Sequence, residues 1–301
     1  RRPPIRDVLL GGGLIETFAF GGEQPGEGQS GGDAVRLKAP VAPLSLAWAV
    51  GVSSAGFGGA FSQAGLAGVT MGTKLDPQAN LWPVTSTEHP GPQQAITYQL
   101  GDGGNLENHG LLLLLQRRAS RIAMLVNYGA PLSSDATNHC ATSAEDLPCP
   151  SSVAGGLGDK FGCGGSNGIE FYSHNQVFAK KELFSLLCEL GQRQQAGKAL
   201  VVRRRLAVHR NAWWGIEGGD TVEIAFVLLD TSGDFESKLP AETRGELSKG
   251  ESGEFSNFPH FSTVLQAADL TALTARQINL LSAHAEYAIL ESAALFQDLL
   301  G

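Results

Sequence analysis

The sequence lacks several features that would assign it to a functional class directly. No stretch reaches the roughly 18 uninterrupted apolar residues of a membrane span, so we expect no transmembrane segment. No run is rich in Lys and Arg and the formal net charge is −8, which argues against a nucleic-acid partner. The same charge gives no attraction to anionic lipid, so any contact with a membrane would have to be apolar. With 42% hydrophobic and 17% charged residues, the composition is that of a globular protein.

The chain also lacks the spacing of a metal site. Its seven histidines form no His-x-x-x-His or His-x-His pair and its four cysteines match no zinc pattern, so we expect neither a metal nor a cofactor. Cys140, Cys149 and Cys163 lie in the Gly/Ser/Pro-rich stretch "NHCATSAEDLPCPSSVAGGLGDKFGCGG". Either disulfides staple this stretch, which implies secretion or an organelle lumen, or the thiols are free.

Glycine, by contrast, is abundant. The 39 glycines indicate long loops and tight turns, because most of them fall in clusters, at 11–13, 21–32, 51–59 and 155–168. We expect one α/β domain over residues 1–301, with a Gly/Ser/Cys-rich loop insertion at 130–170. The first residues, "RRPPIRDVLL", contain no methionine and no signal-peptide pattern, so we expect the chain to be part of a longer product.

Apolar patterns predict alternating strands and helices. Residues 95–101 and 121–129 are typical of buried strands, and the leucine-rich stretch 106–118 between them predicts a helix. A strand, a glycine turn, a helix and a second strand form the unit from which parallel α/β sheets are built. The pattern further predicts one helix that starts near Ser45 and two that cover 176–195 and 274–300. It also predicts strands at 198–209 and 220–230, and a polar connection at 231–258.

One carboxylate stands on a glycine hinge in "YQLGDGGNLENHGLLLLLQRR". Asp102 ends an expected strand and is followed by Gly103 and Gly104, which is where open α/β sheets place their chemistry. Asn105 and Asn108 can orient the carboxylate by hydrogen bonds, and the dipole of the following helix would keep it ionised. Such a carboxylate can act as a general base on a hydroxyl group. The alternative is that Asp102 only caps the helix or shapes the turn.

The stretch "DGGNLENHGLLLLLQRRASRIAMLVN" resembles the Asp motif of patatin-like and cytosolic phospholipase A-like lipid acyl hydrolases. A microbial subgroup of that family reads D-G-G-x-x-E-N-x-G, followed by an apolar helix that ends in Arg-Arg. The stretches "LSLAWAVGVSSAGFGG", "NAWWGIEGGD", "LPAETRGELSKG" and "FPHFST" are also similar to that subgroup, so the resemblance covers most of the chain.

The resemblance implies a three-layer patatin-like sheet flanked by helices, here the C-terminal part of a larger catalytic domain. It also implies a lipid or acyl-ester substrate. Asp102 would accept the proton of a nucleophilic serine directly, while Gly103, Gly104, Asn105 and Asn108 would line the substrate site. Backbone N–H groups of a glycine-rich turn would stabilise the oxyanion.

The chain differs from the family in the serine of this dyad. The family places it in G-x-S-x-G at a turn from strand to helix, and this chain has that spacing only at 28–32 and 164–168, inside glycine-rich stretches that are expected to be loops. The candidate that follows an apolar stretch is Ser53 in "GVSSAG", with Ala55 where the second glycine belongs. Either Ser53 is the nucleophile, or the nucleophile lies upstream of Arg1 or in a separate chain, or the chain has lost catalysis.

Two functions of different classes therefore remain. The first is a lipid acyl hydrolase, a phospholipase or esterase with Asp102 as the base, whose partner could be an N-terminal fragment or another protein chain. The second is a non-catalytic structural or assembly subunit on the same fold. A lipid-binding protein that does not cut its ligand is a third reading.

Two further histidines and one tryptophan pair have two readings each. His109 could line the site or lie partly buried at a helix start. His260, in "FPHFST", could belong to a lid or to a loop that packs on the core. Trp213 and Trp214 could sit at a membrane interface, although paired tryptophans beside a strand are more often packed.

Overall fold

The computed structural model describes residues 30–31, 34–35, 45–53, 78–81, 96–100, 103, 106–127, 131–141, 148–150, 157–163, 174–261 and 273–301. Contacts divide the chain into two compact units, Arg1–Asn108 and His109–Gly301. The boundary falls inside the segment that carries the Asp102 motif. The prediction of one domain over residues 1–301 did not include this division.

The described elements of the first unit are one helix and two short antiparallel strand pairs: β1 (Ser30–Gly31) with β2 (Ala34–Val35), α1 (Leu46–Ser53), and β3 (Gln78–Leu81) with β4 (Ile96–Gln99). The side-chain oxygen of Ser45 accepts a hydrogen bond from the Trp48 N–H at 3.1 Å and so caps α1. This confirms the helix start expected near Ser45. The strand expected at 95–101 forms as β4, but it pairs with β3 and not with a parallel neighbour.

A mixed three-stranded sheet forms the centre of the second unit. The strands are β5 (Arg121–Asn127), β7 (Thr221–Leu229) and β6 (Leu200–Ala207), in that spatial order. β5 runs parallel to β7, with Arg121 opposite Glu223, whereas β6 runs antiparallel to it. Side chains on both faces of the central strand β7 are buried, while those of β5 alternate between buried and exposed. All three strands were expected from the sequence, and the fold is α/β.

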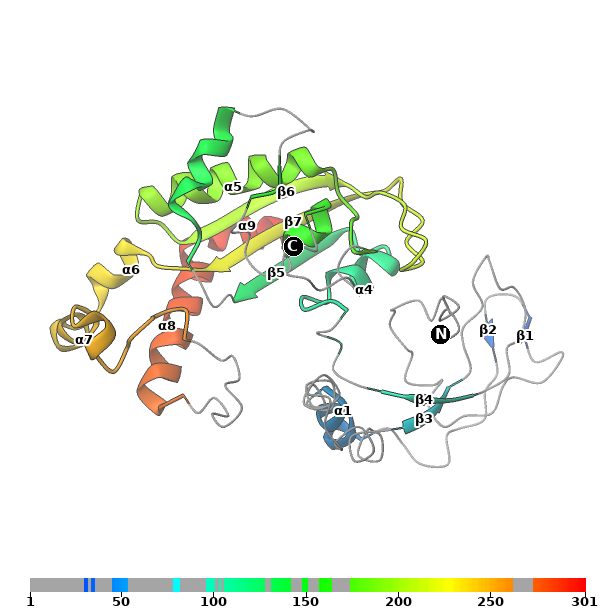
Figure 1. Ribbon diagram of the computed structural model, residues 1–301, viewed down its shortest axis with the longest axis horizontal. Coiled ribbons are helices and arrows are strands. Elements are labelled where there is room, and N and C mark those ends of the chain that lie inside the picture. Colours follow the sequence, from blue (N-terminus) through cyan, green and yellow to red (C-terminus); the bar gives the residue numbers. More distant parts are fainter. Residues whose placement is uncertain are drawn as a thin grey trace, which may run out of the picture. The chain divides into compact units, whose positions relative to one another are not determined.

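Helices cover both faces of this sheet. Figure 1 shows α5 (Lys180–Gln195) on one face and the pair α8 (Ala275–Glu291) and α9 (Ala293–Leu300) on the other. Phe296 and Leu299 of α9 pack in one cluster with Val201 and Val227 of the sheet. The single helix expected at 274–300 is two helices, because the chain leaves the helical conformation at Ser292.

The polar stretch at 231–258 is more ordered than its composition predicts. It contains α6 (Gly233–Lys238), α7 (Ala241–Leu247) and the 3-10 helix η6 (Gly250–Ser252). Ser232 caps α6 by accepting a hydrogen bond from the Phe235 N–H at 3.3 Å. Phe235 is buried in a second apolar cluster, whose other buried members are Phe255, Phe258, Phe261 and Leu280. One buried aromatic ring thus anchors a segment that is otherwise polar.

The leucine helix of the Asp102 motif is shorter than expected. It forms as α4 (Leu111–Gln116) instead of spanning 106–118. Gly110 precedes it with φ at +70°, a left-handed conformation that a helix cannot continue through, and Arg118 ends it with φ at +58°. Within α4 the buried side chains are Leu111, Leu112 and Leu115. The leucine run therefore fixes the second half of the motif to the core of the second unit.

The cysteine-rich segment is held by two disulfides, Cys140–Cys188 and Cys149–Cys163. The first ties the 3-10 helix η3 (Ser134–Ala141) to α5, and the second ties residues 148–150 to the end of η4 (Gly158–Phe161). Of the two readings of these cysteines, the structure has the disulfide-bonded one, which is compatible with an extracellular or lumenal location. Across the described ranges, no helix has both the length and the apolar character needed to cross a membrane.

Candidate functional site

The described part of the Asp102 motif is a tight turn at the protein surface. The carbonyl oxygen of Gly103 accepts hydrogen bonds from the backbone N–H groups of Leu106 and Glu107, each at 2.9 Å. Gly103 is exposed, and a Cβ placed there would meet no atom within 4 Å, so space is open beside this backbone. Asn108 is exposed as well. The remaining predicted residues of the motif, Asp102, Gly104 and Asn105, lie outside the described residues.

Ser53, the candidate nucleophile, is the last residue of α1. Its side chain lies outside the described part of the structure. A nucleophile elbow places the serine after a strand and before a helix, whereas the residues that precede Ser53 are helical from Leu46 onward. The backbone around Ser53 thus differs from an elbow, and its role as nucleophile stays a prediction.

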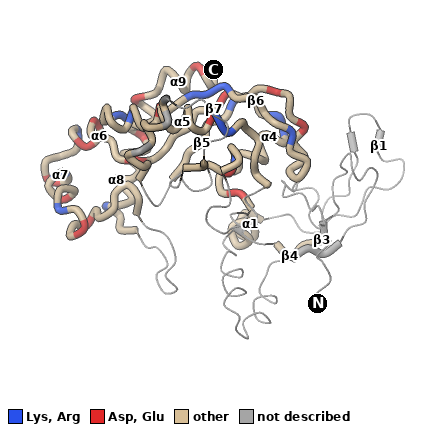
Figure 2. Tube along the Cα trace, turned by 45° about the horizontal axis from the view of Figure 1, so that its top comes forward, with Lys and Arg blue, Asp and Glu red and all other residues tan. Residues whose placement is uncertain are grey.

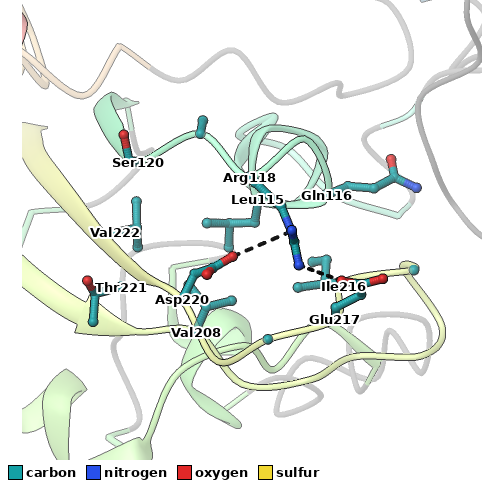
Figure 3. A pocket seen from close by; sticks show the side chains of 13 residues that line it. Leu115, Gln116, Arg118, Ser120, Val208, Ile216, Glu217, Asp220, Thr221 and Val222 are labelled. Carbon is teal, nitrogen blue, oxygen red and sulfur yellow. Dashed lines mark hydrogen bonds and ion pairs between the residues drawn. The ribbon is translucent and has the colours of Figure 1, made fainter. Parts of the chain in front are cut away.

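A pocket of about 620 Å³ lies in the second unit beside the end of α4 (Figure 3). Arg118 reaches across it from the turn after α4. Its Nη2 atom lies 2.5 Å from Oε2 of Glu217, and its Nε atom lies 3.5 Å from Oδ2 of Asp220. Arg118 belongs to the Asp102 motif and both carboxylates belong to "NAWWGIEGGD", so two stretches about 100 residues apart in the sequence meet here.

The position of this pocket does not favour catalysis. Ser120 and Thr221 line it, and they lie at the starts of the parallel strands β5 and β7. The chemistry of α/β sheets is found at the opposite, carboxyl edge of the parallel strands. The guanidinium of Arg118 is already matched by two carboxylates, so we assign this contact a structural role.

At the carboxyl edge of the sheet lies a buried pair of an aspartate and a histidine. Asp230 directly follows β7, and its carboxylate is within 3.2 Å of Nε2 of His260. It also accepts hydrogen bonds from the backbone N–H groups of Leu132 and Thr231, both at 2.6 Å. Burial by itself raises the pKa of Asp230, but these hydrogen bonds outweigh burial and leave the pKa below its ordinary value. Asp230 is therefore held as a carboxylate.

A second buried histidine, His284 of α8, lies close to this pair. The ring of His284 is 1% exposed and packs 4.7 Å from the ring of Phe235 and 5.4 Å from that of Phe258. Its buried Nδ1 atom has no hydrogen-bond partner among the described residues. Burial in this aromatic environment lowers the pKa of His284 to about 4, with Asp230 opposing the shift and His260 adding to it. His284 is thus neutral at physiological pH.

A further polar network is closed to solvent near the second disulfide. The ammonium group of Lys160 lies 3.0 Å from Oδ1 of Asp159, and Asn175 donates to the same carboxylate at 2.8 Å. The indole N–H of Trp214 donates to Asn175 at 2.9 Å. Trp214 is buried and Trp213 stacks on the ring of His174, with 4.4 Å between the ring centres. The packed reading of the tryptophan pair is therefore confirmed.

With this geometry established, we compared the chain with known proteins. No model of a protein family, no curated protein and no solved structure matched it. The site must therefore be judged on its own residues. In the described ranges, no three His, Cys, Asp or Glu side chains gather in a way that could hold a metal ion.

The buried clusters of the second unit stabilise the fold and are not open to a substrate. Asp230 and His260 are 1% and 6% exposed, so the packed reading of "FPHFST" is confirmed and a rim position is not. His109 is partly buried just before α4, as expected for a histidine near a helix start. Sequence reasoning missed Asp230 and His284. Asp230 could have been found by the rule applied to Asp102, since it also ends a predicted strand.

Proposed function

We propose that the chain is the aspartate-bearing part of a lipid acyl hydrolase in which Asp102 is the general base of a Ser–Asp dyad. The observation that carries this proposal is the D-G-G-x-x-E-N-x-G motif followed by an anchored apolar helix. Two further observations support it: the turn at Gly103 is exposed with open space beside it, and α4 is fixed by its buried leucines. An α/β sheet with helices on both faces is compatible with a patatin-like domain.

In the proposed reaction Asp102 accepts the proton of the serine hydroxyl as the serine oxygen attacks the ester carbonyl. The tetrahedral intermediate collapses to an acyl-enzyme, and the leaving alcohol takes the proton back from Asp102. A water molecule then attacks the acyl group while Asp102 accepts its proton, and the carboxylic acid and the free serine are released. Backbone N–H groups of a glycine-rich turn would stabilise the negative oxygen in both halves.

Three sources of the serine remain in the proposal: Ser53, a residue upstream of Arg1, and a separate chain. The two disulfides favour a secreted or lumenal site of action. The second candidate function is a non-catalytic assembly subunit on a phospholipase-like scaffold. It is favoured by the position of Ser53 at the end of a helix, since a nucleophile elbow places the serine after a strand.

Hydrolysis of a soluble short-chain p-nitrophenyl ester tests the proposal, in the chain alone and in the longer product that includes any upstream residues. Asp102→Asn should lower kcat by about 10²- to 10⁴-fold, because an amide cannot accept the proton. The thermal midpoint should not change. Asp298→Asn removes an exposed carboxylate on α9 and is the matched control, which should retain full activity.

A fluorophosphonate probe followed by peptide mass spectrometry locates the nucleophile. Labelling of Ser53 or of an upstream serine that depends on Asp102 supports the hydrolase. If no serine is labelled in any of these forms and no ester is cut, the hydrolase proposal is wrong and the assembly subunit remains. If Asp102→Asn unfolds the protein while activity per folded molecule is unchanged, Asp102 is a structural cap.

A further inference from the structure

A second pocket, of about 470 Å³, lies in the second unit between α6, the end of α7 and the turn that follows η6. Leu247, Phe255 and Phe258 line it with apolar side chains. Glu236 of α6 and Arg244 of α7 also line it and contribute one charge of each sign. A concave site of this size, with apolar walls and a small number of polar groups, has the composition of a site for a small molecule.

Glu236 differs from its acidic neighbours Asp234 and Glu246. Figure 2 shows acidic and basic residues close together along α6 and α7. Asp234 pairs with Lys198, and Glu246 pairs with Lys249, each at 2.5 Å. The half-buried carboxylate of Glu236 has no hydrogen bond or ion pair to any residue that the structure describes, and burial raises its pKa. A partly desolvated carboxylate without a partner is unfavourable, and an ammonium group beside it would remove that cost.

Arg244 has hydrogen-bond donors to spare. Its Nη1 atom donates to the carbonyl oxygen of Ser237 at 2.8 Å, while Nε and Nη2 have no partner within the described ranges. The planar guanidinium of an exposed arginine can hold a carboxylate through two parallel hydrogen bonds. Glu236 and Arg244 line one pocket, yet no ion pair joins these two described residues. The two charges are therefore open to a ligand that carries both of the opposite charges.

We propose that this pocket binds a free α-amino acid with an apolar side chain. The ammonium group of the ligand donates to Glu236, its carboxylate accepts from Arg244, and its side chain packs on Phe255 and Phe258. The pocket selects a zwitterion, because a ligand with one charge leaves either Glu236 or Arg244 without its partner. None of these residues belongs to the Asp102 motif, so the site does not depend on the proposed hydrolase.

Ligand-observed NMR titration of the full chain tests the site with probes that differ by one charged group. L-Phenylalanine and L-leucine should bind saturably, with dissociation constants in the millimolar range or below. 3-Phenylpropionate, which lacks the ammonium group, and phenethylamine, which lacks the carboxylate, should each bind the wild-type chain at least about tenfold more weakly than L-phenylalanine. Each analogue loses one charge-assisted hydrogen bond and leaves one charged side chain unmatched.

Two variants should reverse this selectivity, each for one charge. Glu236→Gln should weaken L-phenylalanine binding by about tenfold and leave 3-phenylpropionate binding unchanged, because that analogue has no ammonium group to lose a contact. Arg244→Gln should weaken L-phenylalanine binding to a similar extent and leave phenethylamine binding unchanged. Glu242→Gln, at an exposed acid of α7 outside the pocket lining, and Arg205→Gln, at an exposed arginine of β6, are the matched controls and should bind as wild type.

Circular dichroism and thermal melting of each variant separate lost binding from lost folding, and the analogue series on the wild-type chain needs no variant at all. The inference is overturned if neither amino acid binds the wild-type chain saturably. It is also overturned if the two analogues bind as tightly as L-phenylalanine, because the pocket then holds a ring without recognising charge. Folded Glu236→Gln and Arg244→Gln variants that bind L-phenylalanine as wild type does would place the ligand elsewhere and would overturn it as well.

Discussion

The Nε2 atom of His260 lies 3.2 Å from Oδ1 of Asp230, and this contact joins the "FPHFST" loop to the carboxyl end of the central strand β7. Both side chains are buried, and two backbone N–H groups complete the shell of the carboxylate. A buried carboxylate with this many donors is costly to alter, because the donors remain buried when the acceptor is removed.

Asp230→Asn should lower the free energy of unfolding by about 3 kcal/mol, since a neutral amide replaces the charge that these donors stabilise. Asp234→Asn is the control, as Asp234 is a half-exposed carboxylate paired with Lys198 at 2.5 Å. We expect it to cost clearly less, because solvent screens an exposed ion pair. Urea unfolding of the two variants measures the difference. Equal losses would show that the Asp230 pair contributes no more than a surface pair.

The stability of the second unit should fall with acidity in a defined window because of His284. Its pKa is about 4 in the folded chain, against an ordinary value of 6.5. Between these two values the unfolded chain binds a proton that the folded chain does not, so the free energy of unfolding decreases as the pH is lowered. The stabilisation is fully present above pH 6.5, and its loss by pH 4 amounts to about 3 kcal/mol.

The control for this titration is His284→Phe, which keeps an aromatic ring among Phe235 and Phe258 and cannot bind a proton. Stability measured from pH 7 to pH 4 should fall less steeply in this variant than in the wild-type chain. Asp230 does not interfere with this comparison. Its lowered pKa affects the free energy of unfolding only below the ordinary pKa of an aspartate, 3.8. The same slope in both proteins would contradict the assignment.

The leucine run of the Asp102 motif should divide into anchoring and dispensable positions. Leu112 is fully buried, and Leu112→Ala should destabilise the chain by about 2 to 5 kcal/mol through lost contacts and the cavity left behind. Leu114, two positions later, is 41% exposed, and Leu114→Ala should cost less than about 1 kcal/mol. Thermal melting of both variants measures the contrast. Similar losses would mean that α4 does not pack as described.

Arg118 combines a strained backbone with exposed ion pairs, and two variants separate these effects. Arg118→Ala removes the contacts to Glu217 and Asp220 but keeps a side chain at φ +58°. Arg118→Gly removes the same contacts and also relieves the strain. The glycine variant should therefore be more stable than the alanine variant by about 1 kcal/mol, as measured by urea unfolding. An alanine variant at least as stable as the glycine variant would contradict this.

Much of the secondary structure was predictable from local patterns. The strands β5, β6 and β7 coincide with apolar runs that contain β-branched residues. Ser45 marks the start of α1, as expected of a cap residue. The helix α4 was predicted too long, because the leucine pattern does not reveal that Gly110 adopts a left-handed conformation. The helix α6 was missed, because its stability depends on one ring, Phe235, that packs against the rings of Phe258 and His284, more than twenty positions away.

The sheet order and the buried charges depend on distant contacts and were not predictable in the same way. That β7 lies between β5 and β6 is a property of packing, as is the pairing of β4 with β3. The partners of Asp230 come from Leu132 and His260, on either side of it in sequence, and no local spacing connects them. For the candidate dyad the sequence supplies an aspartate motif and leaves the source of the serine open.

Covalent cross-links are confined to one of the two units. All four cysteines lie between Cys140 and Cys188, so both disulfides belong to His109–Gly301. A reducing agent therefore acts directly on the second unit alone and changes no covalent bond in Arg1–Asn108. In a melting experiment with two transitions, the one that moves to lower temperature on reduction belongs to the unit that holds the sheet, and the other reports on the unit that holds Asp102 and α1.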